Sequence, residues 1–210
     1  MVHVPSRLFR RIAVYGVLPI LLVFADVPTG LAGEHPAARV INDLGREVET
    51  VLADRQRSEE ERQRTFRDLL KTRFDTAYIA GFVLGRYRNR AGEDERRAFE
   101  SAFVDYIVAT YARRLGRYEG EMPRVEGVTQ ESDPTRVTVR SQLTPPDGPT
   151  VKINWRLRNR GQGWRIVDVV VEGVSLGLTQ RAEFASFLRA NNGRIAALTG
   201  ALEKKVARLN

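Results

Sequence analysis

Two consecutive segments of the chain alternate apolar and polar residues, and this period of two constrains the fold more than any other feature. In 135–143, valine and leucine alternate with arginine, threonine and glutamine; in 151–157, valine, isoleucine, tryptophan and leucine alternate with lysine, asparagine and arginine. Because successive side chains of a strand point to opposite faces, both segments are predicted to be strands with one apolar and one polar face. The turn sequence Pro145–Gly148 predicts that they pair as a hairpin.

Two further strands complete the predicted sheet. Residues 164–171 are apolar at successive positions, which is typical of a central strand that is covered on both faces. Residues 124–129 predict a weaker strand, in which Gly127 marks a bulge. The sequence therefore predicts a four-stranded antiparallel sheet.

The remaining segments have helical periodicity. Ser58 and Glu61 have the spacing of a capping box, Phe74-Asp75 separates two helices, and Gly85 ends the second of these. Helices before and after a meander indicate an α+β fold with helices packed on one face of the sheet. We expect the apolar face of the sheet to pack on the aromatic side of the longest helix. Helices are predicted near 38–53, from Ser58 through Leu70, from the restart at Phe74-Asp75 to Leu84, and near 93–116, 179–190 and 193–207.

The N-terminus has the layout of a cleavable secretory signal peptide. Three arginines precede an uncharged run of 14 residues, Ile12–Ala25, and small residues follow at Gly30 and Ala32. A membrane span needs about 20 apolar residues, so a permanent anchor is the weaker alternative. We expect cleavage after Ala32, with Ala25 as an earlier possibility, and a single domain over residues 33–210.

The composition excludes several chemistries. The 210 residues contain no cysteine, and the two histidines, His3 and His35, both lie near the N-terminus. Zinc clusters of His and Cys, and nucleophiles activated by His, are therefore excluded, and no cofactor or metal is expected. The net charge of +8 suggests that an exported chain meets anionic lipid surfaces or acidic proteins. An exported protein without disulfides fits a bacterial periplasm.

The polar face of the predicted sheet is cationic. It has no interleaved carboxylate, and it is either an ordinary solvated surface or a docking surface for an acidic partner. An adaptor protein recognised through this face is one possible function. The candidate docking residues are Arg136, Arg140, Lys152 and Arg156, with Arg165 beside them.

Two acidic residues occupy unusual positions on the last strand. Asp168 and Glu172 alternate in register with the apolar residues Trp164, Ile166 and Val170, and a carboxylate among apolar neighbours needs a partner. Asp168 could be the general base of a small α+β enzyme. We favour a structural charge pair instead, with Arg86 or Arg181 as the partner of Asp168.

Several stretches, taken in order, resemble one protein family. Phe74-Asp75 leads into Val83-Leu84-Gly85-Arg86-Tyr87, and a long helix runs from Arg97-Ala98-Phe99 through Tyr106 to Tyr111. Trp164 begins a strand that ends in Asp168-Val169-Val170-Val171-Glu172-Gly173-Val174-Ser175-Leu176, followed by Arg181, Phe184 and the helix from Gly193 to Leu202. This set, over about residues 38–205, resembles MlaC, the family of periplasmic phospholipid carriers that includes the toluene-tolerance proteins.

The resemblance implies a soluble carrier rather than an enzyme. Members shuttle phospholipid between an outer-membrane lipoprotein complex and an inner-membrane ABC transporter with its MCE-domain subunit, which maintains outer-membrane lipid asymmetry. Related carriers in hopanoid-associated clusters leave the lipid open. Arg88 departs from the family, where an aromatic residue often follows Gly-Arg-Tyr. The implied apolar pocket between helices and sheet is lined by Val83, Leu84, Phe103, Tyr106, Ile107, Tyr111, Val139, Ile153, Trp155 and Val170.

Overall fold

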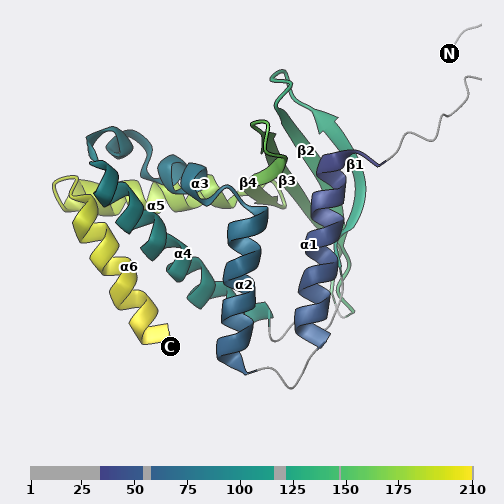
Figure 1. The fold of residues 1–210 in the computed structure, drawn as a ribbon, viewed down its shortest axis with the longest axis horizontal. Helices are drawn as coiled ribbons and strands as arrows, with labels where there is room; N and C mark the ends of the chain where they lie inside the picture. The colour runs from purple at the N-terminus through teal and green to yellow at the C-terminus, as the bar shows by residue number, and fades with distance from the viewer. Residues whose placement is uncertain (1–33, 54–57, 116–121, 147, 210) are drawn as a thin grey trace, which may run out of the picture. The chain divides into compact units, whose positions relative to one another are not determined.

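The computed structural model describes residues 34–53, 58–115, 122–146 and 148–209, all within one unit, Gly33–Asn210. The predicted signal peptide, residues 1–32, lies outside the described residues. In the first half, four α-helices and one 3-10 helix precede the sheet (Figure 1). They are α1 (Pro36–Ala53), α2 (Glu59–Arg73), α3 (Thr76–Leu84), η1 (Gly85–Arg90) and α4 (Glu93–Leu115).

Three of the predicted helix boundaries are confirmed by caps. The Ser58 hydroxyl accepts a hydrogen bond from the Glu61 N–H, and the Glu61 side chain accepts one from the Ser58 N–H, which is the predicted capping box. Asp75 caps α3 by accepting from the Tyr78 N–H at 3.0 Å. Gly85 ends α3 with φ of +56°, a backbone conformation that favours glycine.

The sheet is antiparallel, and it has five strands where four were predicted. The extra strand is the two-residue β5, which pairs with β4 and places β4 fourth in the order β1-β2-β3-β4-β5, not at the centre. Gly127 lies beside a register shift in β1, as predicted. The strands are β1 (Arg124–Gln130), β2 (Arg136–Leu143), β3 (Val151–Asn159), β4 (Trp164–Val171) and β5 (Val174–Ser175).

A bulge in β4 changes which residues share a face. Arg156 of β3 is opposite Asp168, but the next residue, Leu157, is opposite Ile166, so the strand contains one extra residue, Val167. Asp168 therefore lies on the cationic face with Arg156, and Ile166 lies on the apolar face. The prediction that Asp168 and Ile166 share a face was wrong because it assumed an unbroken period of two.

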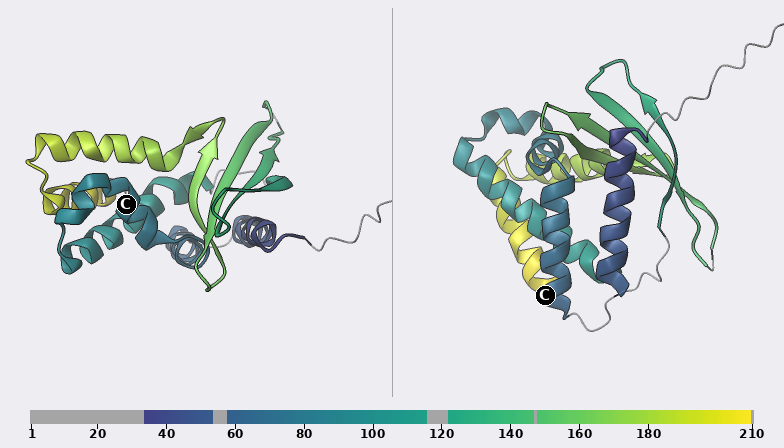
Figure 2. Two further views of the ribbon diagram at one scale, coloured as in Figure 1. Left: turned by 90° about the horizontal axis from the view of Figure 1, so that it is seen from above. Right: turned by 45° about the vertical axis from the view of Figure 1, so that its right-hand side comes forward.

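The apolar face of the sheet packs mainly against α1. Val137, Val139, Leu157 and Ile166 form a buried cluster with apolar residues of α1 and with Leu69 of α2. Figure 2 (right) shows α1 directly against the sheet, with α4 and α6 further away. The expectation that α4 supplies this packing was wrong. Helix α4 is apolar on more than one side, and it packs mainly against other helices.

The aromatic side of α4 packs among helices. Phe99 and Phe103 make edge-to-face contacts with Phe184 of α5, and α4 packs along α6. Another side of α4, with Val104 and Val108, packs against Leu70 of α2.

The last two helices are α5 (Leu176–Ala190) and α6 (Ile195–Leu209), and α5 runs away from the β4–β5 edge (Figure 2, left). None of the described helices combines the length and the hydropathy that a membrane crossing requires.

Candidate functional site

An apolar cavity of about 450 Å³ lies between the helices and the sheet. We call it the main cavity. Helices α2, α3 and α4 face the sheet across it, and the start of α5 closes one end. Its apolar lining consists of Phe66, Leu70, Phe74, Ile79, Val83, Phe103, Val104, Ile107, Tyr111, Trp155, Val167, Val169 and Leu176.

The polar side chains on this lining have partners of their own. Thr76 donates a hydrogen bond to Glu100 at 2.7 Å, and Gln180 donates to Glu183 at 3.0 Å. A polar ligand group buried against the rest of the lining would lose its hydrogen bonds to water without replacement. The interior therefore suits an apolar ligand.

Asp168 lies at the edge of the main cavity as a structural anchor. One carboxylate oxygen accepts from the Gly177 N–H at 3.0 Å, and the other from the Ser175 hydroxyl at 2.7 Å and from Arg156 at 3.1 Å. The predicted structural pair therefore exists, but its cation is Arg156. The donors from Ser175 and Gly177 fix the start of α5 to β4, and Arg156 ties the same carboxylate to β3.

The two arginines that were predicted to pair with Asp168 are used elsewhere. Arg86 donates to the Tyr87 hydroxyl at 3.2 Å, and the Arg181 guanidinium lies 5.2 Å from the centre of the Phe82 ring. The prediction failed because Asp168 faces the strand next to it, where Arg156 is already in register. Arg88, the departure from the family pattern, lies exposed over Gly81.

An exposed apolar corner lies beside the main cavity. Leu176 lines the cavity and is also 41% exposed, and Val174 and Leu178 on either side of it are more exposed still. Among the residues that the structure describes, these three are the large hydrophobic side chains that face solvent most openly. We call these three residues the apolar corner.

A second apolar cavity, of about 230 Å³, lies between α1, α2 and the sheet. Ile41, Leu44 and Val48 of α1 line it on one side and Ile153 of the sheet on another. The sequence analysis did not predict this cavity, because its α1 residues have the periodicity of ordinary core residues. It shares four lining residues with the main cavity: Phe66, Leu70, Phe74 and Trp155.

The structure places six of the ten predicted pocket residues on these two linings. Val83, Phe103, Ile107, Tyr111 and Trp155 line the main cavity, and Ile153 and Trp155 line the second. Leu84, Tyr106, Val139 and Val170 line neither cavity.

These four lie on other packed faces. Leu84 and Tyr106 are buried among helices, and Val139 is buried under α1. Val170 lies beyond the β4 bulge, on the cationic side of the sheet. The sequence analysis missed Phe66 and Leu70 of α2, whose spacing of four residues places them on one side of the helix, and Phe74, which directly follows α2.

The four predicted docking residues share one face of β2 and β3, as expected from the period of two. Arg136 is engaged: it donates to the Tyr78 hydroxyl at 3.2 Å, which raises the pKa of its guanidinium above the ordinary value. Arg156 pairs with Asp168. Arg140 and Lys152 are exposed and have no ion-pair partner among the described residues. Arg165 donates to the Thr72 carbonyl at 2.6 Å.

A family model named "MlaC protein" matches residues 39–204. The chain belongs to the MlaC family. The predicted resemblance is confirmed. The described residues of this MlaC-family chain contain no group of three or more His, Cys, Asp or Glu side chains that could hold a metal ion.

Two curated relatives have informative names. The intermembrane phospholipid transport system binding protein MlaC of Haemophilus influenzae is 26% identical over 102 residues, which is 47% of this chain and 48% of the relative. The toluene tolerance protein ttg2D of Pseudomonas putida is 24% identical over 106 residues, 50% of this chain and 49% of the relative. The chain thus matches these relatives over about half of their length.

A solved structure has the same fold. It is that of a phospholipid-binding protein from Ralstonia solanacearum in complex with a phospholipid, with a TM-score of 0.73 and 21% sequence identity. The match covers 82% of this chain and 98% of the solved one. The predicted α+β class is therefore confirmed for the MlaC-family chain, with five strands in its sheet.

Proposed function

We propose that this MlaC-family chain is a periplasmic phospholipid carrier whose main cavity holds acyl chains. The observation that carries the proposal is the apolar cavity of about 450 Å³, whose lining residue Leu176 is also part of the exposed apolar corner. The names of the relatives, with phospholipid transport, phospholipid binding and toluene tolerance among them, support the same cargo. Such a carrier needs no catalytic residue.

The physical need for a carrier follows from the hydrophobic effect. Exposing each methylene group to water costs about 0.8 kcal/mol, so a lipid with roughly 30 of them faces a very high barrier to leaving a membrane. A closed apolar cavity removes most of that cost. The apolar corner would let the chains pass into the cavity without crossing open water.

The route and the partners are part of the proposal. Residues 1–32 direct export, and the carrier then moves lipid between an outer-membrane lipoprotein complex and an inner-membrane ABC transporter with its MCE-domain subunit. Arg140 and Lys152, the two exposed cations of the β2–β3 face that have no ion-pair partner among the described residues, supply the docking charge. The experiment described next determines whether the bound lipid is a phospholipid or a hopanoid.

The test is to purify the secreted protein without detergent and to measure what it carries. Native mass spectrometry should show bound phospholipid, and extraction should identify its class. Removing the lipid should lower the melting temperature, because a ligand that binds only the folded state stabilises it. A protein that emerges without lipid and takes none up from phospholipid vesicles would contradict the proposal; a bound hopanoid would change the cargo.

A further inference from the structure

Helix α5 lies along α3 and the η1 segment that follows it. A Cβ atom added to Gly177, near the start of α5, would lie 3.3 Å from the Phe82 ring of α3. One added to Gly193, just after α5, would lie 3.1 Å from the Tyr87 ring of η1. The two contacts occur in the same order along both segments, so α3 and η1 run beside α5 in the same direction. We call this line of contact the α3–α5 seam.

Two arginines at the seam lie against glycines. A Cβ atom added to Gly81 would lie 3.0 Å from the Arg88 side chain, and one added to Gly85 would lie 2.9 Å from Nε of Arg181. Gly81 and Gly85 are four residues apart, which places them on the same side of α3, where Arg181 of α5 lies. A larger residue at either glycine would displace the arginine that covers it.

Aromatic rings position three arginines at the seam. The guanidinium carbons of Arg86 and Arg90 lie 5.1 and 5.9 Å from the centre of the Tyr87 ring, and that of Arg181 lies 5.2 Å from the centre of the Phe82 ring. A ring face within about 6 Å attracts a cation without neutralising it. These side chains are therefore held in place while their charge stays available. We use the name arginine row for Arg86, Arg88, Arg90 and Arg181.

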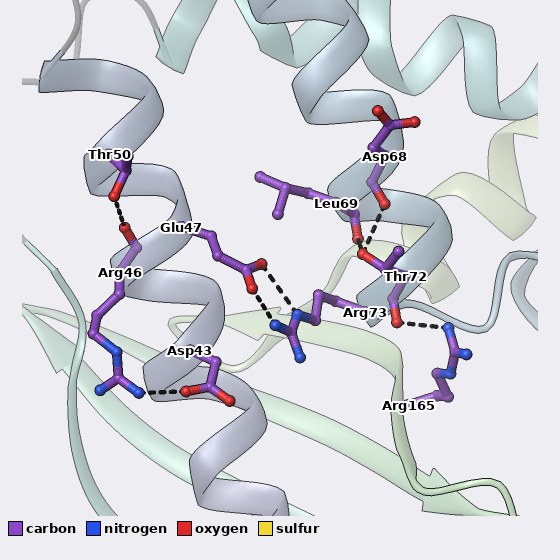
Figure 3. Close-up of polar contacts among 9 residues, drawn as sticks. All are labelled: Asp43, Arg46, Glu47, Thr50, Asp68, Leu69, Thr72, Arg73 and Arg165. Carbon is purple, nitrogen blue, oxygen red and sulfur yellow. Dashed lines mark hydrogen bonds and ion pairs between the residues drawn. The ribbon is translucent and has the colours of Figure 1, made fainter.

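The charge of the arginine row is not balanced by nearby carboxylates. All four side chains are exposed, and none of them forms an ion pair with another residue that the structure describes. Arg73 of α2, by contrast, pairs with Glu47 of α1 (Figure 3). Together, α3, η1 and α5 contain five arginines and one carboxylate, Glu183, which accepts a hydrogen bond from Gln180. The seam consequently carries a strong positive potential.

The apolar corner lies at the start of the seam. Leu178 precedes Arg181 by three residues on α5, so the two side chains are neighbours on the helix surface. Val174 follows a tight turn in which Glu172 and Gly173 have φ of +48° and +82°, and the Glu172 carboxylate accepts a backbone N–H of β3. Val174 is 57% exposed and Leu178 53%. Apolar side chains at a turn thus continue directly into the arginine row.

An anionic lipid bilayer fits this combination better than an acidic protein does. Proteins that lie on a membrane place apolar side chains at the boundary between headgroups and acyl chains and cations at the level of the headgroups. The arginines are distributed along a helix of 15 residues, about 22 Å long, and do not converge on one point. A bilayer presents phosphate groups along the whole of that length. The apolar side chains also project from a turn, where they can enter the bilayer surface.

We propose that the apolar corner and the arginine row together form a surface that docks on bilayers containing anionic lipid. Val174 and Leu178 enter the headgroup boundary, and the arginines contact lipid phosphates. Leu176 of the apolar corner also lines the main cavity, so docking would bring the cavity next to the bilayer. This inference goes beyond the proposed function, which assigns the β2–β3 face to docking on a protein, and its test requires no bound cargo.

The test is a flotation assay of the secreted protein with vesicles at low salt. One set of vesicles contains phosphatidylcholine alone, and the other contains equal parts of phosphatidylcholine and phosphatidylglycerol. Wild-type protein should bind the anionic vesicles at least about tenfold more strongly, because each cation near an anionic surface adds about fivefold in affinity. The difference should shrink as salt screens the charges.

Two charge-reversal variants test the arginine row from its two ends. Arg88→Glu, Arg181→Glu and Arg86→Glu, Arg90→Glu should each weaken binding to the anionic vesicles at least about tenfold. Lys204→Glu, Arg208→Glu on α6 makes the same change in net charge on exposed residues and is the matched control, which should bind within about threefold of wild type.

A third variant tests the apolar corner without changing the charge. Val174→Ser, Leu178→Ser should weaken binding to the anionic vesicles at least about tenfold, because less apolar surface enters the bilayer. Val174→Ile, Leu178→Met keeps the apolar surface and should bind like wild type. All variants change exposed side chains, and their melting temperatures show that they are folded.

Four results would overturn the inference. Wild-type protein that binds both sets of vesicles equally, or neither, has no such surface. An equal loss in the α6 control would show that net charge alone causes the binding. A loss in the arginine variants without a loss in Val174→Ser, Leu178→Ser would identify an electrostatic site for an acidic macromolecule instead of a bilayer. Full binding in both arginine variants would exclude the row. Lipid content, measured on the same preparations, tests the proposed function separately.

Discussion

The buried guanidinium of Arg158 on β3 donates to the carboxylate of Asp75, the residue that caps α3, with Nε 2.7 Å from Oδ2. The same guanidinium lies 4.0 Å from the centre of the Tyr78 ring. These contacts join the sheet to the first turn of α3. Helix α3 carries Ile79 and Val83 into the main cavity, so this pair positions part of its wall.

We predict that Asp75→Ala destabilises the protein by about 3 kcal/mol, because it removes the cap of α3 and leaves the charge of Arg158 buried without a partner. Urea denaturation measures this change. Asp75→Asn keeps an acceptor for the cap, and the double variant Asp75→Asn, Arg158→Met removes the charge as well. The double variant should be more stable than Asp75→Ala; if all three are as stable as wild type, the pair contributes nothing.

The anchor at Asp168 leads to a second prediction. Asp168→Asn should lower the free energy of unfolding by about 1–3 kcal/mol, because an amide nitrogen would face one of the three donors. Arg156→Met should cost less than about 1 kcal/mol, since Arg156 is half exposed. Thermal or urea denaturation distinguishes the two. An unchanged stability in Asp168→Asn would return this residue to consideration as a catalytic base.

The local signals in the sequence were sufficient for most of the elements. Ser58 and Glu61 announced the start of α2, Gly85 the end of α3, and the alternation in β2 and β3 gave their two faces correctly. These features depend on residues that are close in the chain. The interactions that determine them form within a single helical turn or hairpin.

The packing of helices against the sheet depends on residues that are far apart in the chain, and the predictions of this packing were partly wrong. A period of two cannot show that Val167 is an extra residue in β4, so the side chains before and after it were assigned to one face. Helix α4 is apolar on more than one side, and no local pattern states which side meets the sheet. Phe66 and Leu70 lie on one side of a predicted helix and Phe74 follows that helix, but only the tertiary structure shows that all three line both cavities.

The turn after β1 provides a pH-dependent test. The Thr135 hydroxyl and the Thr135 N–H donate to Asp133 at 2.6 and 2.9 Å, and they hold the pKa of its carboxyl below the ordinary value. Because the folded pKa is lowered, this contribution to stability is present above the unfolded pKa of about 3.9 and is lost as the pH falls through the folded value. Thr135→Val should raise the pKa of Asp133, as measured by carbon NMR of the carboxyl; Thr150→Val should not.

A charge inside the main cavity should remove the cargo. Ile107 is half-buried and lines the cavity, and Ile107→Asp places a carboxylate where an acyl chain would lie. We expect at least about a tenfold loss of bound phospholipid in protein purified without detergent, with Ile107→Leu as the matched control. The comparison uses variants that still unfold cooperatively. A folded Ile107→Asp protein that retains full lipid would show that the main cavity is not the site.

The exposed cations of the β2–β3 face should control the rate of delivery and leave the binding of lipid unaffected. Arg140 and Lys152 have no ion-pair partner among the described residues, whereas Arg136 and Arg156 are held by their own partners. The double variant Arg140→Glu, Lys152→Glu should therefore slow transfer to membranes that contain the ABC transporter by about tenfold at low salt, because charge steering raises association rates. The difference should shrink as salt screens the charges. Lys204→Glu, Arg208→Glu on α6 makes the same change in net charge and should have little effect, and both variants should retain wild-type lipid content. Equal transfer rates for the two double variants at low salt would identify the β2–β3 face as an ordinary solvated surface.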